Sequence, residues 1–210
     1  MRISRFAFGS AVVVAVAASV STPARAQDPD SSYINIGTYT IAFGVGDTRR
    51  FTQTLGWFGM GWDGQWPFRS PHLSKGLSFT LQDFANAKGG TTNFPSGAVT
   101  GHQTSEILMM SLLGNVRWYP GEHWGRGLYV GLGAGGEFDT QYYNIAATQQ
   151  LSRYGVHVAV APDVGYITQV IGLDMVVNAR FLVPNSAGSY LGGGPRSFQY
   201  VALSFGIAER

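Results

Sequence analysis

The sequence predicts an all-β protein, an eight-stranded antiparallel β-barrel that spans a membrane. Three observations predict this fold. Apolar residues recur at every second position over long segments, charged residues make up only 12% of the 210 residues while 29 are glycine, and the chain begins with a segment typical of exported proteins. A soluble domain typically carries about 25% charged residues and about 7% glycine, so this composition is unusual for one.

Residues 1–26 have the features of a secretory signal. Two arginines give a positively charged start, Phe6 to Val20 form an apolar stretch, and Ala24-Arg25-Ala26 provides small residues at the cleavage site. The apolar stretch is shorter than the roughly 20 residues that a membrane-spanning helix needs. We therefore expect a cleaved signal peptide at 1–26 and a single barrel domain over 27–210.

The basic character of the whole chain comes from this signal. The formal net charge is +2 and the isoelectric point is near 9.0. Without Arg2, Arg5 and Arg25 the chain keeps 11 basic and 12 acidic residues. A basic patch for nucleic acid is therefore not indicated. The absence of cysteine excludes a disulfide framework and cysteine-based metal or redox sites.

The first four predicted strands differ in clarity. The segments 33–45 and 51–63 are strand-like, but which of their faces is apolar is ambiguous. In 77–82, leucine and phenylalanine alternate with small polar residues, and in 108–118 apolar residues alternate with a set that includes Arg117. Such alternation is typical of a strand with one apolar face and one small or polar face.

The last four predicted strands are 127–143, 153–166, 173–183 and 200–207, and each shows the same alternation. Turn residues separate the eight segments. They are Gly44 to Asp47, Pro67 with Pro71, Pro120-Gly121, Pro184-Asn185, and Gly192 to Pro195. The longest loop is expected at 84–104, which is rich in glycine, threonine and asparagine, and further loops at 144–152 and 184–195.

The second face of the strands is too poor in charge for a soluble surface but suits a narrow lumen. The apolar face then meets lipid, with aromatic girdles at both interfaces. Tyr154 and Tyr166 bracket four valines, and at about 3.4 Å per residue and a tilt near 40° they are roughly 31 Å apart along the membrane normal. The predicted girdle consists of Trp118, Tyr142, Tyr154 and Tyr166. The alternative is a soluble secreted β-protein that binds an apolar ligand.

Several segments resemble the bacterial outer-membrane β-barrel domain family, in particular its small eight-stranded, OmpA/OmpX-like members. These segments are 115–120 (NVRWYP), 127–133 (GLYVGLG), 161–166 (APDVGY) and the glycine-rich approach to the last strand, 192–207. The resemblance implies an outer membrane of Gram-negative type, periplasmic termini and longer loops outside. It also implies outer-membrane lipids, lipopolysaccharide and the assembly machinery as partners. Members often end on an aromatic residue, whereas this chain continues past Phe205 to Glu209-Arg210, so its assembly signal is atypical.

The remaining polar pattern is a set of charged residues on the lumen face. Buried charges need partners, so we expect a network that plugs the barrel. Its predicted members are Arg117, Asp163 and Asp174 toward the periplasmic end, Glu137, Asp139, Arg153 and Arg180 toward the outer end, and His157. The alternative is that these residues line a narrow path for ions or small solutes.

No catalytic, metal-binding or cofactor-binding residues are expected. The GxGxxG match at 131–136 lacks the helix that a dinucleotide site needs, and the four histidines lack metal-ligand spacing. A lipid A deacylase is the main enzymatic alternative, because 57–66 is rich in tryptophan. The stretch 180–186, however, contains no histidine to serve as a base for Ser186.

We therefore expect a non-enzymatic outer-membrane barrel with a structural, adhesive or surface-interaction role through its extracellular loops. A narrow channel for ions or small hydrophobic solutes is the alternative, and a lipid A deacylase-like hydrolase is a remote one.

Overall fold

The computed structural model describes residues 33–94, 97–121, 124–145, 149–185, 188–189 and 195–210. The predicted signal peptide, 1–26, lies outside the described residues and remains a prediction. The elements in chain order are β1 (Ile34–Gly46), α2 (Asp47–Thr52), β2 (Leu55–Gly56), β3 (Phe58–Phe68), β4 (Ser70–Phe94), β5 (Gly97–Trp118), β6 (Gly127–Ile145), β7 (Gln149–Val170), β8 (Leu173–Pro184), β9 (Gly188–Ser189), β10 (Pro195–Arg196) and β11 (Phe198–Glu209).

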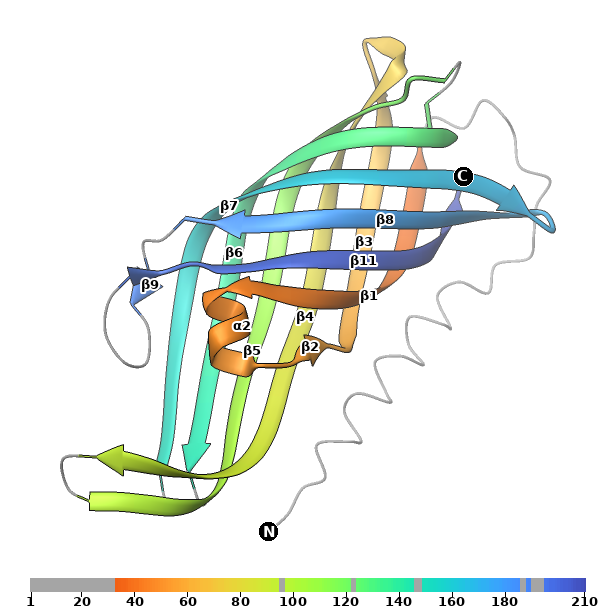
Figure 1. Cartoon of the computed structure of the whole chain (residues 1–210). Coiled ribbons are helices and arrows are strands. Elements are labelled where there is room, and N and C mark those ends of the chain that lie inside the picture. Colours follow the sequence, from red (N-terminus) through yellow and green to blue (C-terminus); the bar gives the residue numbers. More distant parts are fainter. Residues whose placement is uncertain (1–32, 95–96, 122–123, 146–148, 186–187, 190–194) are drawn as a thin grey trace. The chain divides into compact units, whose positions relative to one another are not determined.

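Eight of these strands form one closed antiparallel barrel, as the sequence predicted (Figure 1). Strands β1, β3, β4, β5, β6, β7, β8 and β11 follow one another around it, each paired with its neighbour. The barrel closes where β11 pairs with β1 from Asn35↔Glu209 to Gly46↔Phe198. The short β2 also pairs with β1, at Phe43↔Leu55, while β9 and β10 form a separate two-stranded sheet.

The predicted strand 51–63 is wrong in its first part, where the structure has the end of the helix α2. Asp47 lies in the first turn of α2, which favours the helix dipole, and forms an ion pair with Arg50 one turn later. The helix ends at Gln53, which adopts a left-handed conformation with φ 53°. Its Phe51 packs at the mouth of the barrel. Tertiary packing therefore holds this segment in place, and the alternation of apolar residues used to predict strands gives no information on such packing.

The predicted loop 84–104 is also wrong, because β4 and β5 pair without interruption from Leu73↔Trp118 to Phe94↔Gly97. The distal part of this hairpin is exposed around Lys88 and Thr91. Both of its faces therefore accept polar residues, and the apolar alternation that marks a half-buried strand is absent there. Predicted loop 144–152 is likewise mostly strand, since β6 reaches Ile145 and β7 begins at Gln149.

The apolar faces that the sequence predicted lie on the outside of the barrel. Exposed apolar side chains include Leu112, Val116, Leu128, Val130, Leu132, Val158, Val160, Val164, Met175, Val177, Leu203 and Phe205. A barrel with an apolar exterior and a polar interior is the arrangement that spans a bilayer. Among the described residues, no helix is long and apolar enough to cross a membrane.

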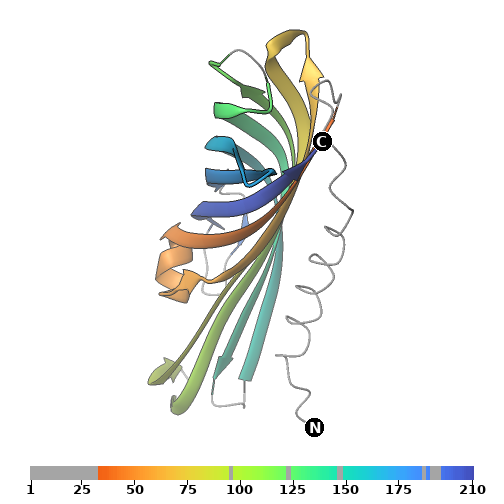
Figure 2. The ribbon, with the colours of Figure 1, turned by 90° about the vertical axis from the view of Figure 1, so that its right-hand side faces the viewer.

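Four strands extend beyond the closed part of the barrel as an open sheet (Figures 1 and 2). On its β3 side, β4 is paired only up to Asp83, whereas its pairing with β5 continues to Phe94. On its β8 side, β7 is paired only from Ala159, whereas its pairing with β6 starts at Gln149. We call residues 84–94, 97–107, 141–145 and 149–158 the open sheet.

The closure of the barrel sets where the hydrocarbon core of the bilayer lies. A backbone edge without partners is not tolerated in hydrocarbon. The hydrocarbon core therefore surrounds the closed part of the barrel, which includes Leu132. The open sheet, which includes Val156, lies outside the hydrocarbon core.

This placement is tested by introducing arginine at two exposed apolar positions. Leu132→Arg is expected to lower the free energy of unfolding by about 2–4 kcal/mol, as for arginine near a bilayer midplane, and Val156→Arg by about 0–1 kcal/mol. Urea unfolding of the protein refolded in lipid vesicles measures both. Equal penalties at the two positions would contradict the placement.

Candidate functional site

Three levels of the barrel interior can be followed along β8. Its inward-facing residues Val176, Asn178, Arg180 and Leu182 are all buried. Val176 belongs to an apolar cluster at the end of the barrel that holds Ile34 and Ala208, and Leu182 belongs to a second apolar cluster at the opposite end. The polar side chains between them form the middle layer. The lumen therefore has apolar packing at both ends.

The middle layer is an ion cluster of two arginines and two aspartates. Arg117 is fully buried and its Nη2 lies 3.0 Å from Oδ2 of both Asp63 and Asp163. Arg180 Nη2 lies 3.2 Å from Asp63 Oδ1 and 3.5 Å from Asp163 Oδ2. Each arginine thus contacts both carboxylates, and the formal charges within the cluster balance.

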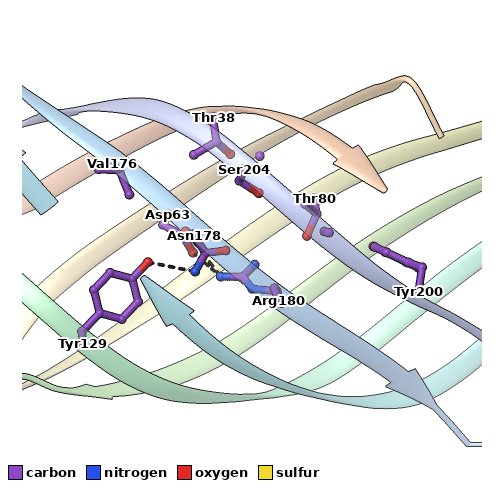
Figure 3. Close-up of a pocket in the computed structure, with 11 residues that line it drawn as sticks. Thr38, Asp63, Thr80, Tyr129, Val176, Asn178, Arg180, Tyr200 and Ser204 are labelled. Atoms are coloured by element: carbon purple, nitrogen blue, oxygen red, sulfur yellow. Dashed lines mark hydrogen bonds and ion pairs between the residues drawn. The ribbon is translucent and has the colours of Figure 1, made fainter. Parts of the chain in front are cut away.

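Neutral groups complete the cluster (Figure 3). Asn178 donates from Nδ2 to Asp163 Oδ2 at 3.1 Å and to the Tyr129 hydroxyl at 2.9 Å. The Arg117 guanidinium lies over the Tyr129 ring, 4.5 Å from its centroid. Gly131 leaves the space that the cluster occupies, since a Cβ there would lie 2.1 Å from Asp163 Oδ1. These contacts hold the cluster in one arrangement.

A second polar group lies on the inner face of β6 and β7, farther from the chain termini. His157 Nε2 lies 2.7 Å from Asp139 Oδ2, and Gln141 donates from Nε2 to Asp139 Oδ1 at 2.8 Å. Gly155 makes room for this pair, because a Cβ there would lie 2.2 Å from Asp139 Oδ2. Glu137 lies directly across the ladder from His157 and is only 2% exposed.

The structure distributes the predicted lumen residues differently from the sequence prediction. Arg117, Asp163 and Arg180 come together, although Arg180 was expected near the outer end. The stagger of the strands explains this, since Arg180 pairs directly with Asp163. Asp174 is buried near the terminal end, outside the four-residue cluster. Arg153 is exposed on the open sheet rather than buried in the lumen, because β7 is past the closed barrel there.

The sequence reasoning missed Asp63, which contacts both arginines of the ion cluster. Its neighbour Trp62 is exposed on the outside, so the two residues fit the alternation of β3. The alternation of Trp62 and Asp63 was visible in the sequence. The strand was expected to start at residue 51, however, and over that longer range its apolar and polar faces could not be told apart.

The predicted girdle residues lie at two levels. Trp118 and Tyr166 are exposed on the outside of the barrel, near the end that holds the chain termini. Tyr154 and Tyr142 lie on the open sheet, where Tyr154 is exposed and stacks on Phe138 at 6.2 Å between ring centroids. Tyr142 and Tyr154 therefore lie outside the closed barrel.

Within the described ranges, no group of three or more histidine, aspartate or glutamate side chains is arranged to hold a metal ion. Ser186 and His123 lie outside the described residues. A cavity of about 10 Å³ beside the ion cluster is lined by Thr38, Thr80, Tyr129, Asn178, Arg180 and Ser204, among others (Figure 3). Such a cavity has space for about one water molecule.

Comparisons with known proteins add a likeness of fold. No described family and no curated protein matches the sequence. The chain is similar in structure to the attachment invasion locus protein Ail of Yersinia pestis, solved with the heparin analogue sucrose octasulfate, at 10% identity and a TM-score of 0.49, covering 84% of this chain and 97% of Ail. It is also similar to the N-terminal β-barrel domain of Pseudomonas aeruginosa OprF, at 13% identity and a TM-score of 0.44, covering 85% of this chain and 98% of that domain. A third similar structure is Neisserial surface protein A, at 10% identity and a TM-score of 0.46, covering 85% of this chain and 96% of that protein. Sequence identities and TM-scores this low assign no function to this chain.

The class that the fold and the surface define is a small membrane-spanning β-barrel with a filled lumen and an open sheet at one end.

Removal of Arg117 tests the ion cluster. Arg117→Met leaves Asp63 and Asp163 buried with only Arg180, so the free energy of unfolding is expected to fall by about 3–5 kcal/mol. Arg126→Met, at an exposed arginine in the β5–β6 turn, is the matched control and should change it by no more than about 0.5 kcal/mol. Urea titration in detergent micelles measures both variants. A small change for Arg117→Met would mean that the cluster does not stabilise the barrel.

The packed lumen predicts the electrical behaviour of the barrel. In planar bilayers the purified protein is expected to give no stable single-channel steps, and Arg180→Ala should behave in the same way, because the apolar packing at both ends of the lumen remains. Stable steps whose conductance changes with Arg180→Ala would contradict this and favour a narrow channel.

Proposed function

We propose that the protein is a non-enzymatic outer-membrane protein whose closed barrel is an anchor and whose open sheet makes contacts at the cell surface. The observation that carries this proposal is the extension of β4, β5, β6 and β7 past the point where the barrel closes. A membrane anchor alone needs only strands long enough to cross the bilayer, about 9–11 residues. Strands β4, β5 and β7 have 25, 22 and 22 residues.

The orientation of the open sheet supports a role outside the cell. The first and last strands pair at Asn35↔Glu209, so both ends of the barrel domain lie at the end opposite the open sheet. An exported chain whose termini remain in the periplasm places the open sheet outside.

The open sheet is held in place by side-chain contacts at its base. Phe51 of α2 packs against Tyr143 of β6 and Phe198 of β11, each at 6.2 Å between ring centroids. Lys88 on β4 donates to Gln53 Oε1 at 3.1 Å, and Tyr143 donates to Gln103 Oε1 at 3.0 Å. A surface fixed before binding loses less conformational entropy on association, which favours recognition.

Shortening the β4–β5 hairpin tests the proposal. Joining Ala87 to Thr104, which are paired across the ladder, through an Asn-Gly turn removes the distal hairpin and keeps the strand register. The shortened barrel is expected to fold and to keep its heat-modifiable mobility on gels. Bacteria displaying it should adhere at least tenfold less to cultured epithelial cells than bacteria displaying the full chain.

The matched control for this experiment is Ile171→Asn, a change in the exposed β7–β8 turn at the opposite end of the barrel. It should leave adhesion unchanged. Equal adhesion of the full and shortened proteins, at equal surface amounts, would contradict a role of the open sheet in surface contacts.

A further inference from the structure

Two cations lie together on the outer face of the barrel, at the end that holds the chain termini. Arg69 is in the turn between β3 and β4, and Lys75 is on β4. The turn lies at this end because β3 pairs with the first residues of β1, at Ile34↔Gln65. Both cations contact one aromatic ring, since Arg69 Cζ lies 5.1 Å and Lys75 Nζ lies 5.6 Å from the centroid of the Phe68 ring. We call Phe68, Arg69 and Lys75 the basic cluster.

The basic cluster lies at the boundary of the hydrocarbon core. Lys75 is directly across the ladder from Val116, an exposed apolar residue of the lipid-facing surface. The next outward-facing residue of β5 toward the same end is Trp118, which is also exposed, and such aromatic side chains mark the interface. The backbone of Lys75 is therefore at the edge of the hydrocarbon, and its side chain reaches toward the turn. A lysine near the end of a membrane-spanning segment places its ammonium among the headgroups in this way.

Neither cation has an anionic partner in the part of the chain that the structure describes. Within that part, the ion pairs join other residues, and neither Arg69 nor Lys75 forms a side-chain hydrogen bond. The face of the Phe68 ring attracts both cations and holds two positive charges close to each other. A phosphate placed against them would accept charge-assisted hydrogen bonds from both.

The turn that holds Arg69 has a backbone conformation that is costly for an arginine. Arg69 has φ 57°, in the left-handed region that glycine and asparagine adopt more readily. Such a conformation persists where the surrounding structure holds it, and ligand-binding positions are a frequent place for it. The Pro71 carbonyl accepts a hydrogen bond from the Trp124 amide at 2.7 Å, and the segment after the turn is thereby fixed to the β5–β6 connection. A site that is fixed before binding loses less conformational entropy when a ligand binds.

The surface next to the basic cluster, on the side of the hydrocarbon core, is apolar. Leu77 and Phe79 follow Lys75 on the outer face of β4, and both are exposed. Gly114 pairs with Leu77 and is also exposed. A Cβ at Gly114 would meet no atom nearer than the Ala134 carbonyl oxygen, at 3.9 Å. The surface beside Leu77 is therefore shallow and open, which suits an acyl chain that lies against it.

We propose that the basic cluster binds the phosphate of an anionic glycerophospholipid, in the leaflet at the end of the barrel that holds the chain termini. The phosphate contacts Arg69 and Lys75, and an acyl chain of the same lipid lies against Leu77 and its neighbours. A zwitterionic lipid brings a cation of its own next to the two basic side chains, so it binds more weakly. A free phosphate ion has the same charge chemistry but leaves the apolar surface without a contact. The site is separate from the open sheet, and the inference does not depend on the proposed function.

The test measures which lipids the protein retains. The protein is released from nanodiscs that contain equal amounts of phosphatidylglycerol and phosphatidylcholine with the same acyl chains, and native mass spectrometry counts the bound lipids. The wild type is expected to retain phosphatidylglycerol in preference to phosphatidylcholine. Lys75→Met and Arg69→Gln should each lower the retained phosphatidylglycerol about fivefold, as for the loss of one cation near an anionic surface. Lys75→Arg, which keeps the charge, should retain as much as the wild type.

The matched control is Arg126→Met, because Arg126 is an exposed arginine at the same end, in the β5–β6 turn, and is not one of the two cations over Phe68. It should leave the retained phosphatidylglycerol unchanged, and heat-modifiable mobility shows that each variant folds. A loss equal to that of Lys75→Met would mean that diffuse positive charge attracts the lipid, and it would overturn the proposal. Equal retention of the two lipids by the wild type, or unchanged retention by Lys75→Met or Arg69→Gln, would overturn it as well.

A further arm distinguishes a lipid phosphate from a free phosphate ion. Inorganic phosphate added to the nanodiscs before release should not displace phosphatidylglycerol from the wild type, because the ion makes no contact with the apolar surface beside Leu77. Displacement of the lipid by inorganic phosphate would assign the basic cluster to a free ion and contradict a lipid site.

Discussion

The requirement that every backbone polar group be paired inside the hydrocarbon core determines the rest of the structure. In lipid an unpaired N–H or C=O costs several kcal/mol, so the sheet must close. Here closure is made by the β11–β1 ladder. Closure places one set of alternating side chains in lipid and the other in a narrow lumen. Where closure ends, at Asp83 on β4 and Ala159 on β7, the constraint ends, and the strands continue as the open sheet.

The lumen shows how a narrow barrel accommodates charge. Two arginines and two aspartates, each contacting both members of the opposite sign, balance their formal charges within the lumen. The apolar clusters on either side, around Tyr129 and around Phe84, bury this cluster away from bulk water and thereby strengthen its electrostatic interactions. The same packing is the reason for the expectation that the barrel does not conduct. Stability and the expected lack of conductance therefore have one cause, the packing of the lumen.

The sequence predicts the lipid-facing strands well and the open sheet poorly, for one physical reason. Strands such as 127–143 separate lipid from a polar lumen, so the alternation is strong. The segment 84–104 forms the longest hairpin among the described strands, but its distal part is exposed to water. No apolar alternation is therefore visible in its sequence. The ion cluster was predicted in part: the inward charges of Arg117, Asp163 and Arg180 were visible, but their pairing and the role of Asp63 depend on the stagger between strands that are distant in sequence. The stagger is a property of the closed barrel and of no single segment.

The central claim is that the hydrocarbon core ends where the barrel closes and leaves the open sheet in water. Because the chain has no cysteine, single cysteines can be introduced along β7 at Val156, Val160 and Val164 and spin-labelled without background. In lipid nanodiscs, electron paramagnetic resonance should find oxygen to be the stronger relaxant at Val160 and Val164, and a water-soluble nickel complex to be the stronger one at Val156. Oxygen accessibility at Val156 equal to that at Val164 would place this part of the open sheet in the membrane and contradict the account.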